Sequence, residues 1–120
     1  MRKILVFGSN TEGRHGKGVA KLALDNHGAI YGQARGLQGN SYAIVTKDLA
    51  KGYRSVSLES IQEQVVEFME FARNNPSMEF YVSPIGCGLA GFKIDEIAPM
   101  FKDNPGNVEL CEFFKCFNEQ

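Results

Sequence analysis

The chain has 120 residues, a net charge of −1 at pH 7 and a hydrophobic content of 43%, which predicts one globular domain over residues 1–120. Proteins that bind nucleic acid by neutralising phosphates are normally basic or carry a basic run. Because this chain has no such run, we expect no direct nucleic-acid binding. The three cysteines, Cys87, Cys111 and Cys116, lack the spacing of a disulfide framework or a zinc knuckle. We therefore expect no metal and no cofactor.

Targeting signals are not evident in the sequence. No apolar run approaches the roughly 18 residues of a membrane span, and the N-terminus leads into a strand without the apolar core of a signal peptide. Together with the odd number of cysteines, this predicts a cytoplasmic protein without membrane contact.

The first predicted element is a short buried strand over residues 2–7. A helix is expected over residues 16–26, with Gly28 as its stop signal. Residues 28–40 are punctuated by glycines and are expected to be mostly loop. The apolar positions that keep helical spacing in residues 16–26 are Val19, Leu22 and Ala23.

A second strand is expected over residues 41–46, ending at Lys47. The clearest helix covers residues 57–74, and either Ser57 or Ser60 can cap its N-terminus. Its apolar face consists of Leu58, Ile61, Val65, Phe68, Met69 and Ala72.

Three further elements complete the chain: a buried strand over residues 78–83, a short helix over 94–101 and a last strand over 108–114. Strands and helices therefore alternate, which predicts an α/β fold with a mainly parallel sheet. In such sheets, ligands bind beyond the carboxyl ends of the strands. The three segments that follow the strands over residues 2–7, 41–46 and 78–83 could therefore line one crevice.

Glycine is enriched in two of those segments. The chain has 13 glycines, about 11% against a usual share of about 7%. One glycine-rich loop covers residues 8–18 and the other covers residues 86–91. Strand, glycine loop and helix N-terminus together aim backbone N–H groups at one point, which suits a phosphate. Two such loops predict one extended ligand with more than one anionic group.

The first loop does not match two common nucleotide motifs. In a P-loop the lysine is followed by serine or threonine, which holds magnesium, whereas Gly16-Lys17 is followed here by Gly18. The G-x-G-x-x-G pattern of dinucleotide-binding folds is also missing. These departures argue against a P-loop ATPase and a Rossmann dehydrogenase.

A family resemblance rests on three segments in order. Residues 85–92, Ile-Gly-Cys-Gly-Leu-Ala-Gly-Phe, resemble the second phosphate loop of macro domains, closest to the branch of terminal ADP-ribose protein glycohydrolases. Residues 9–20 resemble the first ligand loop of that branch, and Val45-Thr46-Lys47 resembles the end of its next strand. The resemblance covers roughly residues 4–101. The chain also resembles compact macro-like proteins of phages and prophages.

The resemblance implies a compact three-layer α/β/α fold with a mainly parallel or mixed sheet, and binding of ADP-ribose or a related nucleotide-derived metabolite. The loop from Gly86 to Gly91 would hold the diphosphate through its N–H groups. Asn10, His15 and Gly16 would face the distal ribose. The ligand-binding residues expected in this way are Gly8, Ser9, Asn10, His15, Gly16, Gly18, Ile85, Gly86, Cys87, Gly88, Leu89, Ala90, Gly91 and Phe92.

The resemblance also identifies Lys47 as a candidate catalytic residue. In the similar hydrolases, a lysine at this position attacks the ribose carbon, and an aspartate at the position of Ala90 resolves the adduct. Alanine replaces that aspartate here, so hydrolysis requires a substitute such as Asp48 or Asp95. Lys47 is alternatively an electrostatic ligand contact or an ordinary exposed lysine. An ADP-ribosylated macromolecule is a further candidate partner.

The chain begins too late for the strands that usually carry the adenine-reading acidic group of macro domains. A C-terminal segment rich in phenylalanine (Phe113, Phe114 and Phe117) is a candidate replacement. An alternative function is that of a phage-type interaction or inhibitor protein that uses the fold as a scaffold.

Several residues keep two interpretations. Between glycines, His15 is expected to be exposed, as a ligand contact, as an acid–base group or as a residue without a role in the site. Cys87 is either a small residue packed under its loop or a thiol with a lowered pKa beside a helix N-terminus. The polar residues of the long glycine segment form either a lid over a ligand or a plain loop; they are Tyr31, Gln33, Arg35 and Gln38.

Overall fold

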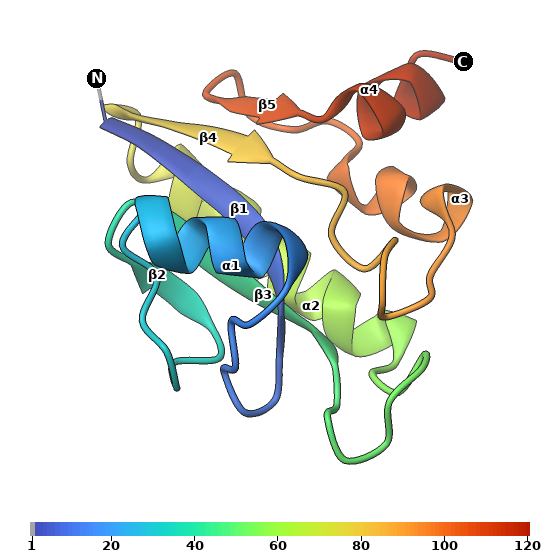
Figure 1. The fold of residues 1–120 in the computed structure, drawn as a ribbon. Coiled ribbons are helices and arrows are strands. Elements are labelled where there is room, and N and C mark those ends of the chain that lie inside the picture. The colour runs from blue at the N-terminus through green and yellow to red at the C-terminus, as the bar shows by residue number, and fades with distance from the viewer. Residues whose placement is uncertain (1) are drawn as a thin grey trace.

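The protein is built around one mixed five-stranded sheet with the strand order β2-β3-β1-β4-β5. In the computed structural model, which describes residues 2–120, β1 pairs in parallel with both β3 and β4, and β4 pairs in parallel with β5. Only β2 runs antiparallel, against β3. The prediction of a mainly parallel sheet is therefore confirmed (Figure 1). The strands are β1 (Arg2–Asn10), β2 (Gly36–Gln38), β3 (Ser41–Lys47), β4 (Met78–Val82) and β5 (Val108–Leu110).

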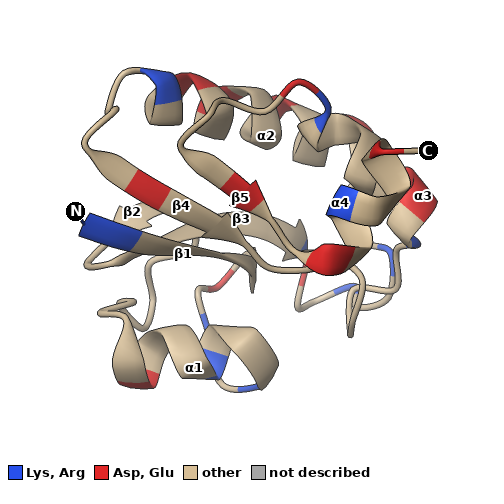
Figure 2. Cartoon of the chain, turned by 90° about the horizontal axis from the view of Figure 1, so that it is seen from above, with Lys and Arg blue, Asp and Glu red and all other residues tan. Residues whose placement is uncertain are grey.

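The helices lie on both sides of this sheet. Figure 2 shows α1 on one face and α2 on the other, with α3 and α4 gathered at one end of the molecule. Two parallel strands of one sheet are joined by a crossover connection, which is usually a helix packed on a face of the sheet. The helices are α1 (Gly18–Asn26), α2 (Leu58–Arg73), α3 (Ile94–Ile97) and α4 (Glu112–Asn118), and a 3₁₀ turn, η1 (Ala98–Phe101), continues α3.

The main hydrophobic core lies between α2 and the sheet, as the apolar face of residues 57–74 predicts. Five of the six residues of that face are buried, and Leu58 is partly buried. Phe68 packs edge-on against Phe80 of β4, with ring centroids 5.3 Å apart. The side chain of Ser57 accepts a hydrogen bond from the N–H of Ser60, so Ser57 is the N-cap.

A smaller core lies under α1 and differs from the expected one. Ala23 is buried against Phe7 and Ala43, whereas Val19 and Leu22 are exposed. The helix therefore packs Ala20, Ala23 and Leu24 toward the sheet, and its expected apolar face is only partly correct. Gly28 ends the helix with a φ of +73°, as expected of a C-terminal glycine.

Residues 28–40 are mostly loop, as expected, but they also contain the short strand β2, which the local sequence does not reveal because it depends on pairing with β3. One further expectation is wrong. The last strand stops at Leu110, and residues 112–118 form α4 instead of continuing the strand. Helical spacing lets Phe114 stack on Phe101, with ring centroids 5.7 Å apart, and this packing favours the helix.

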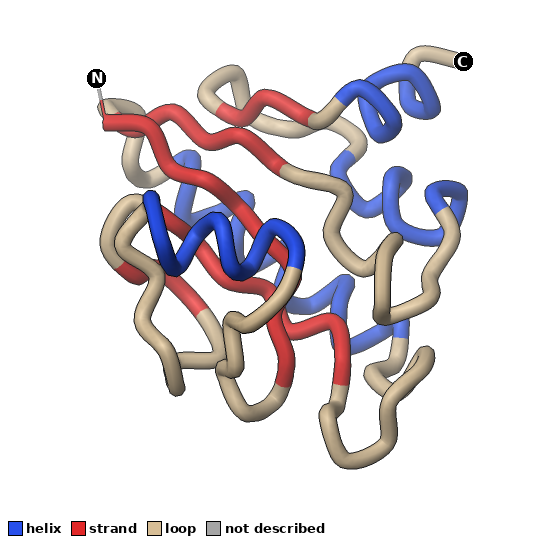
Figure 3. Tube along the Cα trace, in the orientation of Figure 1, coloured by secondary structure: helices blue, strands red, loops and turns tan. Residues whose placement is uncertain are grey.

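The carboxyl ends of β1, β3 and β4 lie side by side, since these strands are parallel neighbours. The loops that follow them leave the sheet at the same end (Figure 3). Both glycine-rich loops and the segment after Lys47 are thereby brought together, as predicted from the topology.

Candidate functional site

A cavity of about 1250 Å³ opens at this end of the sheet. Its walls come from the loop after β1, the end of β3, the loop after β4, and α4. Of the fourteen residues expected to contact a ligand, twelve line the cavity, and His15 and Gly91 do not. Lys47 also lines it. The sequence-based prediction of one shared crevice therefore agrees with the geometry.

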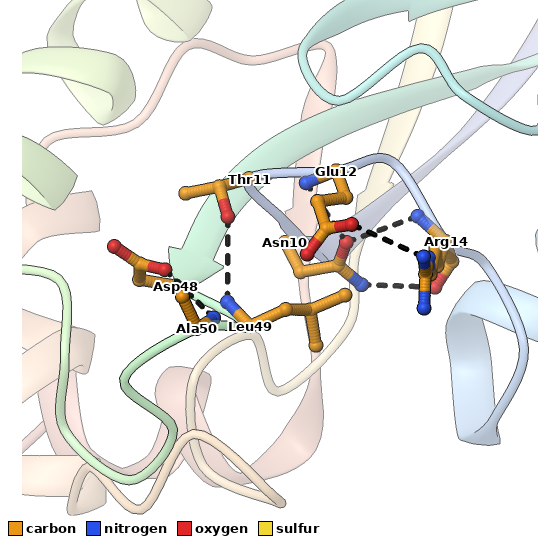
Figure 4. A network of polar contacts seen from close by, with 7 residues as sticks. All are labelled: Asn10, Thr11, Glu12, Arg14, Asp48, Leu49 and Ala50. Carbon is orange, nitrogen blue, oxygen red and sulfur yellow. Dashed lines mark hydrogen bonds and ion pairs between the residues drawn. The ribbon is translucent and has the colours of Figure 1, made fainter.

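The first glycine-rich loop is held in shape by Asn10 (Figure 4). Its side-chain Oδ1 accepts hydrogen bonds from the N–H groups of Glu12 at 3.2 Å and Arg14 at 3.0 Å, and its Nδ2 donates to the carbonyl of Arg14 at 2.8 Å. Asparagine side chains often organise turns in this way. Asn10 thus shapes the loop in addition to lining the cavity.

The loop is also tied to the segment after β3. The N–H of Thr11 donates to the carbonyl of Lys47 at 3.0 Å. The Oγ1 of Thr11 accepts from the N–H of Leu49 at 3.3 Å (Figure 4). Asp48 accepts from the N–H of Ala50 at 2.9 Å. These bonds fix the backbone on both sides of Lys47, which therefore has a defined place at the cavity wall.

The second glycine-rich loop makes a tight double turn. The N–H of Phe92 donates to the carbonyl of Gly86, which has a φ of +75°, and the N–H of Gly91 donates to the carbonyl of Gly88. Within residues 2–120, the N–H groups of Gly88, Leu89 and Ala90 donate to no protein acceptor. Successive unpaired N–H groups of this kind form anion-binding concavities.

Gly16 and Gly88 line the cavity without a structural reason to be glycine. Neither has a positive φ, and a Cβ at either position would meet no atom within 4 Å. A side chain would therefore fit the fold at both places. Because glycine has no side chain, a ligand in the cavity can approach the backbone closely at these two positions.

Arg54 fastens the second loop from the segment after β3. Its guanidinium donates to both carboxylate oxygens of Glu96, at 2.7 and 2.6 Å, and to the carbonyl of Gly91 at 3.1 Å. Its backbone N–H donates to the carbonyl of Ala90 at 2.8 Å. The Arg54 guanidinium also lowers the pKa of Glu96 to about 2, so this carboxylate is ionised at neutral pH.

The charges around the cavity are mostly positive. Four basic residues and one acidic residue, Asp95, line it, although the whole chain has a net charge of −1. This local excess favours anionic ligands. The four basic residues are Arg14, Lys17, Lys47 and Lys93. Of these, only Lys47 was predicted as a site residue, because nothing in the local sequence shows that the other three converge on the cavity.

His15 is buried, contrary to the expectation of an exposed histidine. It is 0% exposed, packs edge-on against Phe7 and contacts the carbonyl of Gln33 and Oε1 of Gln38 through Nε2, each at 3.1 Å. Since both partners are acceptors, Nε2 carries the proton. His15 thus ties the first loop to residues 33–38 and is not placed to contact a ligand in the cavity.

The four polar residues that were expected to form either a lid or a plain loop have different roles in the structure. Gln33 and Gln38 hold His15, and Arg35 forms an ion pair with Glu67 of α2. Only Tyr31 of the four lines the cavity, where its side chain is exposed.

Cys87 packs against the main core as well as lining the cavity. Burial raises the pKa of its thiol to about 11, so the thiol stays protonated at neutral pH. This agrees with the interpretation of Cys87 as a packed residue and contradicts the alternative of a thiol with a lowered pKa.

Apolar side chains cluster at the rim of the cavity. The helix α4, which the sequence analysis missed, places Phe113 and Phe117 there. Phe113 is 59% exposed, and Phe114 of the same helix is buried in the core. Val19, Tyr31 and Leu89 are also exposed and line the cavity. Exposed apolar groups gathered around a hollow are typical of a binding site.

The two candidate substitutes for the missing aspartate differ in position. Asp95 lines the cavity, whereas Asp48 does not. Ala90 is itself at the cavity wall and buried. Among residues 2–120, Asp95 is therefore the one acidic residue of the cavity wall.

Comparisons with known proteins give no match to a protein-family model or to a curated protein. Among residues 2–120, no three histidine, cysteine, aspartate or glutamate side chains converge as a metal site would require. The described helices are all too short or too polar to cross a membrane.

Proposed function

We propose that the protein binds ADP-ribose or a related nucleotide-derived metabolite in this cavity, and that its sheet with helices on both faces is a compact three-layer version of the macro fold. The observation that carries the proposal is the convergence of both glycine-rich loops on one electropositive cavity at the carboxyl ends of β1, β3 and β4. Sites in open α/β sheets lie at this end.

Each part of such a ligand has a matching part of the cavity. The unpaired N–H groups of Gly88, Leu89 and Ala90 suit a diphosphate, and the basic side chains add charge of the right sign. Phe113 offers an exposed aromatic ring for stacking a base. The distal ribose would lie toward Asn10 and Gly16.

Calorimetric titration with ADP-ribose, AMP and ribose 5-phosphate tests this proposal. We expect micromolar binding of ADP-ribose and weaker binding of the two fragments. Gly88→Glu should abolish binding, because it places a carboxylate in the anion site. Gly106→Glu is the matched control, since a Cβ there also meets no atom within 4 Å and Gly106 does not line this cavity.

Absence of both heat and thermal shift with all three compounds would overturn the proposal. An interaction protein that uses the fold as a scaffold would then be the better hypothesis. Its partner binding should survive Gly88→Glu.

We rank binding above hydrolysis because Ala90 stands where the similar hydrolases have their resolving acid. If the protein removes ADP-ribose from a carboxylate or a nucleobase, the Lys47 amine forms a bond to the ribose carbon while the bond to the leaving group breaks, and water then releases the sugar. Lys47→Ala should abolish such activity and retain affinity. An unchanged rate in that variant would exclude the lysine mechanism.

A further inference from the structure

Three buried residues with hydroxyl side chains line the cavity at the carboxyl ends of three neighbouring parallel strands. Ser9 is on β1, Thr46 is on β3, and Ser83 directly follows β4. All three line the cavity and are at most 4% exposed. Since β1 lies between β3 and β4, Ser9 is the central one.

Two of the three hydroxyls are already used by the protein. Ser83 Oγ donates to the carbonyl of Val6 at 2.6 Å, and Thr46 Oγ1 donates to the carbonyl of Ser9 at 3.4 Å. Ser9 Oγ has no hydrogen-bond partner among the described residues. A buried hydroxyl without a partner is unfavourable, so this one calls for an explanation.

The surroundings keep Ser9 in place. Its neighbour Gly8 leaves so little room that a Cβ would lie 3.2 Å from Thr46 Oγ1 and 3.4 Å from the backbone N of Gly86. Ser9 is paired with Val45 of β3, directly before an irregularity in the strand register. The backbone that carries the Ser9 hydroxyl is therefore held in place by close packing and by strand pairing.

We infer that Ser9 Oγ is reserved for an oxygen atom of the ligand, either a sugar hydroxyl or a phosphoryl oxygen. This inference rests on the proposed function, because it places the ligand in the same cavity. A rotation about χ1 moves the hydroxyl between three staggered positions, which lets it turn to the ligand. The unsatisfied hydroxyl of the free protein then gains its partner on binding.

The assignment predicts opposite effects of one substitution on stability and on affinity. Ser9→Ala removes an unpaired polar group, so the melting temperature of the free protein should stay the same or rise. The same substitution should weaken ADP-ribose binding by about threefold to tenfold, the usual effect of losing one neutral hydrogen bond, and by more if the partner is charged. Ser83→Ala is the matched control and should lower the melting temperature, because it removes a hydrogen bond of the fold.

Thermal melting and calorimetric titration of the wild type and both variants provide the test, with ADP-ribose, ADP and AMP as probes. Weakened binding of both ADP-ribose and ADP would assign the contact to a phosphoryl oxygen. Weakened binding of ADP-ribose alone would assign it to the terminal sugar.

Unchanged affinity of Ser9→Ala for a ligand that the wild type binds would overturn the assignment and leave the proposed function intact. A fall in melting temperature like that of Ser83→Ala would also overturn it, since the hydroxyl would then serve the fold. If the wild type binds none of the probes, the proposed function fails and the assignment fails with it.

Discussion

Gln64 is the residue whose burial the helical pattern least explains. It lies on the core side of α2, where its Oε1 accepts from the N–H of Val45 at 2.7 Å and its Nε2 donates to the carbonyl of Val45 at 2.8 Å. The pairing of β2 with β3 ends at Ala43. The amide of Gln64 therefore replaces the missing strand beyond that point and satisfies both backbone groups.

We expect Gln64→Leu to lower the free energy of unfolding by about 2–4 kcal/mol, because it leaves two buried backbone groups without partners. Urea denaturation measures this change. Gln62→Leu removes the same amide from a less buried position of the helix and should change stability by much less. Equal effects of the two substitutions would contradict this role of Gln64.

Cys87 gives a prediction about pH. Burial is the main cause that raises the pKa of its thiol to about 11, and Cys111 and Glu96 add to it. Because only the thiolate is alkylated, the rate of reaction with iodoacetamide should rise about tenfold per pH unit from pH 8 to pH 10. Mass spectrometry of the Cys87 peptide in a Cys116→Ser variant measures this rate. A plateau below pH 9 would contradict the raised pKa.

At the scale of elements, the second glycine-rich loop depends on a segment far away in the sequence. Arg54 binds Glu96, Gly91 and the carbonyl of Ala90, and its guanidinium lies 5.0 Å from the centroid of the Phe92 ring. A Cβ at Gly91 would collide with the ring of Tyr53 at 2.0 Å. The segment after β3 is thus packed directly on the loop that would hold the phosphates.

We expect Arg54→Ala to speed hydrogen exchange in residues 86–92 and to leave β1 and β4 unchanged, because the substitution removes contacts to the loop and to Glu96 of α3 but none to these strands. Exchange monitored by mass spectrometry tests this. Lys51→Ala, in the same segment and also exposed, is the control. Unchanged exchange in residues 86–92 would mean that the loop holds its own shape.

The same ion pair gives stability a defined pH dependence. Folding lowers the pKa of Glu96 from an ordinary 4.5 to about 2, chiefly through the Arg54 hydrogen bonds. A lowered carboxyl pKa stabilises the folded state above the unfolded value, and this contribution is lost as the pH falls from about 4.5 to about 2. The stability difference between wild type and Glu96→Gln should therefore be constant above pH 5 and shrink below it. A constant difference down to pH 2.5 would contradict the lowered pKa.

The elements that the sequence predicted are those whose pattern is local. The apolar face of α2, the strand before Gly86 and the glycine that ends α1 all follow from spacing and backbone preferences. Strand β2 could not be found, because three residues with two partly buried positions carry no pattern until they pair with β3. The strand predicted over residues 108–114 is too long. Phe113 and Phe114 suit a strand in their local sequence, and the helix is favoured only because Phe114 packs on Phe101.

For the whole molecule, the sequence predicts those features of the candidate site that follow from the order of strands and helices. Parallel neighbours bring their loops together, so the shared cavity followed from the alternation of strands and helices. The burial of His15 and the convergence of the cations depend on contacts between distant segments. Such contacts leave no trace in a single sequence.

Basic residues that line the cavity are expected to affect ligand binding more than basic residues outside it. Lys17 is the N-cap residue of α1 and Lys21 lies in the first turn of that helix, but only Lys17 lines the cavity, whereas Lys21 pairs with Asp25 at 2.8 Å. Exposed charges contribute modestly and are screened by salt. Lys17→Gln should therefore weaken ADP-ribose binding by about twofold to fivefold at low salt, and by less at high salt. Lys21→Gln removes the same charge one helical turn away and should have little effect. Equal loss in both variants would mean that the ligand responds to net charge and not to the charges of the cavity, and titrations at two salt concentrations decide between these outcomes.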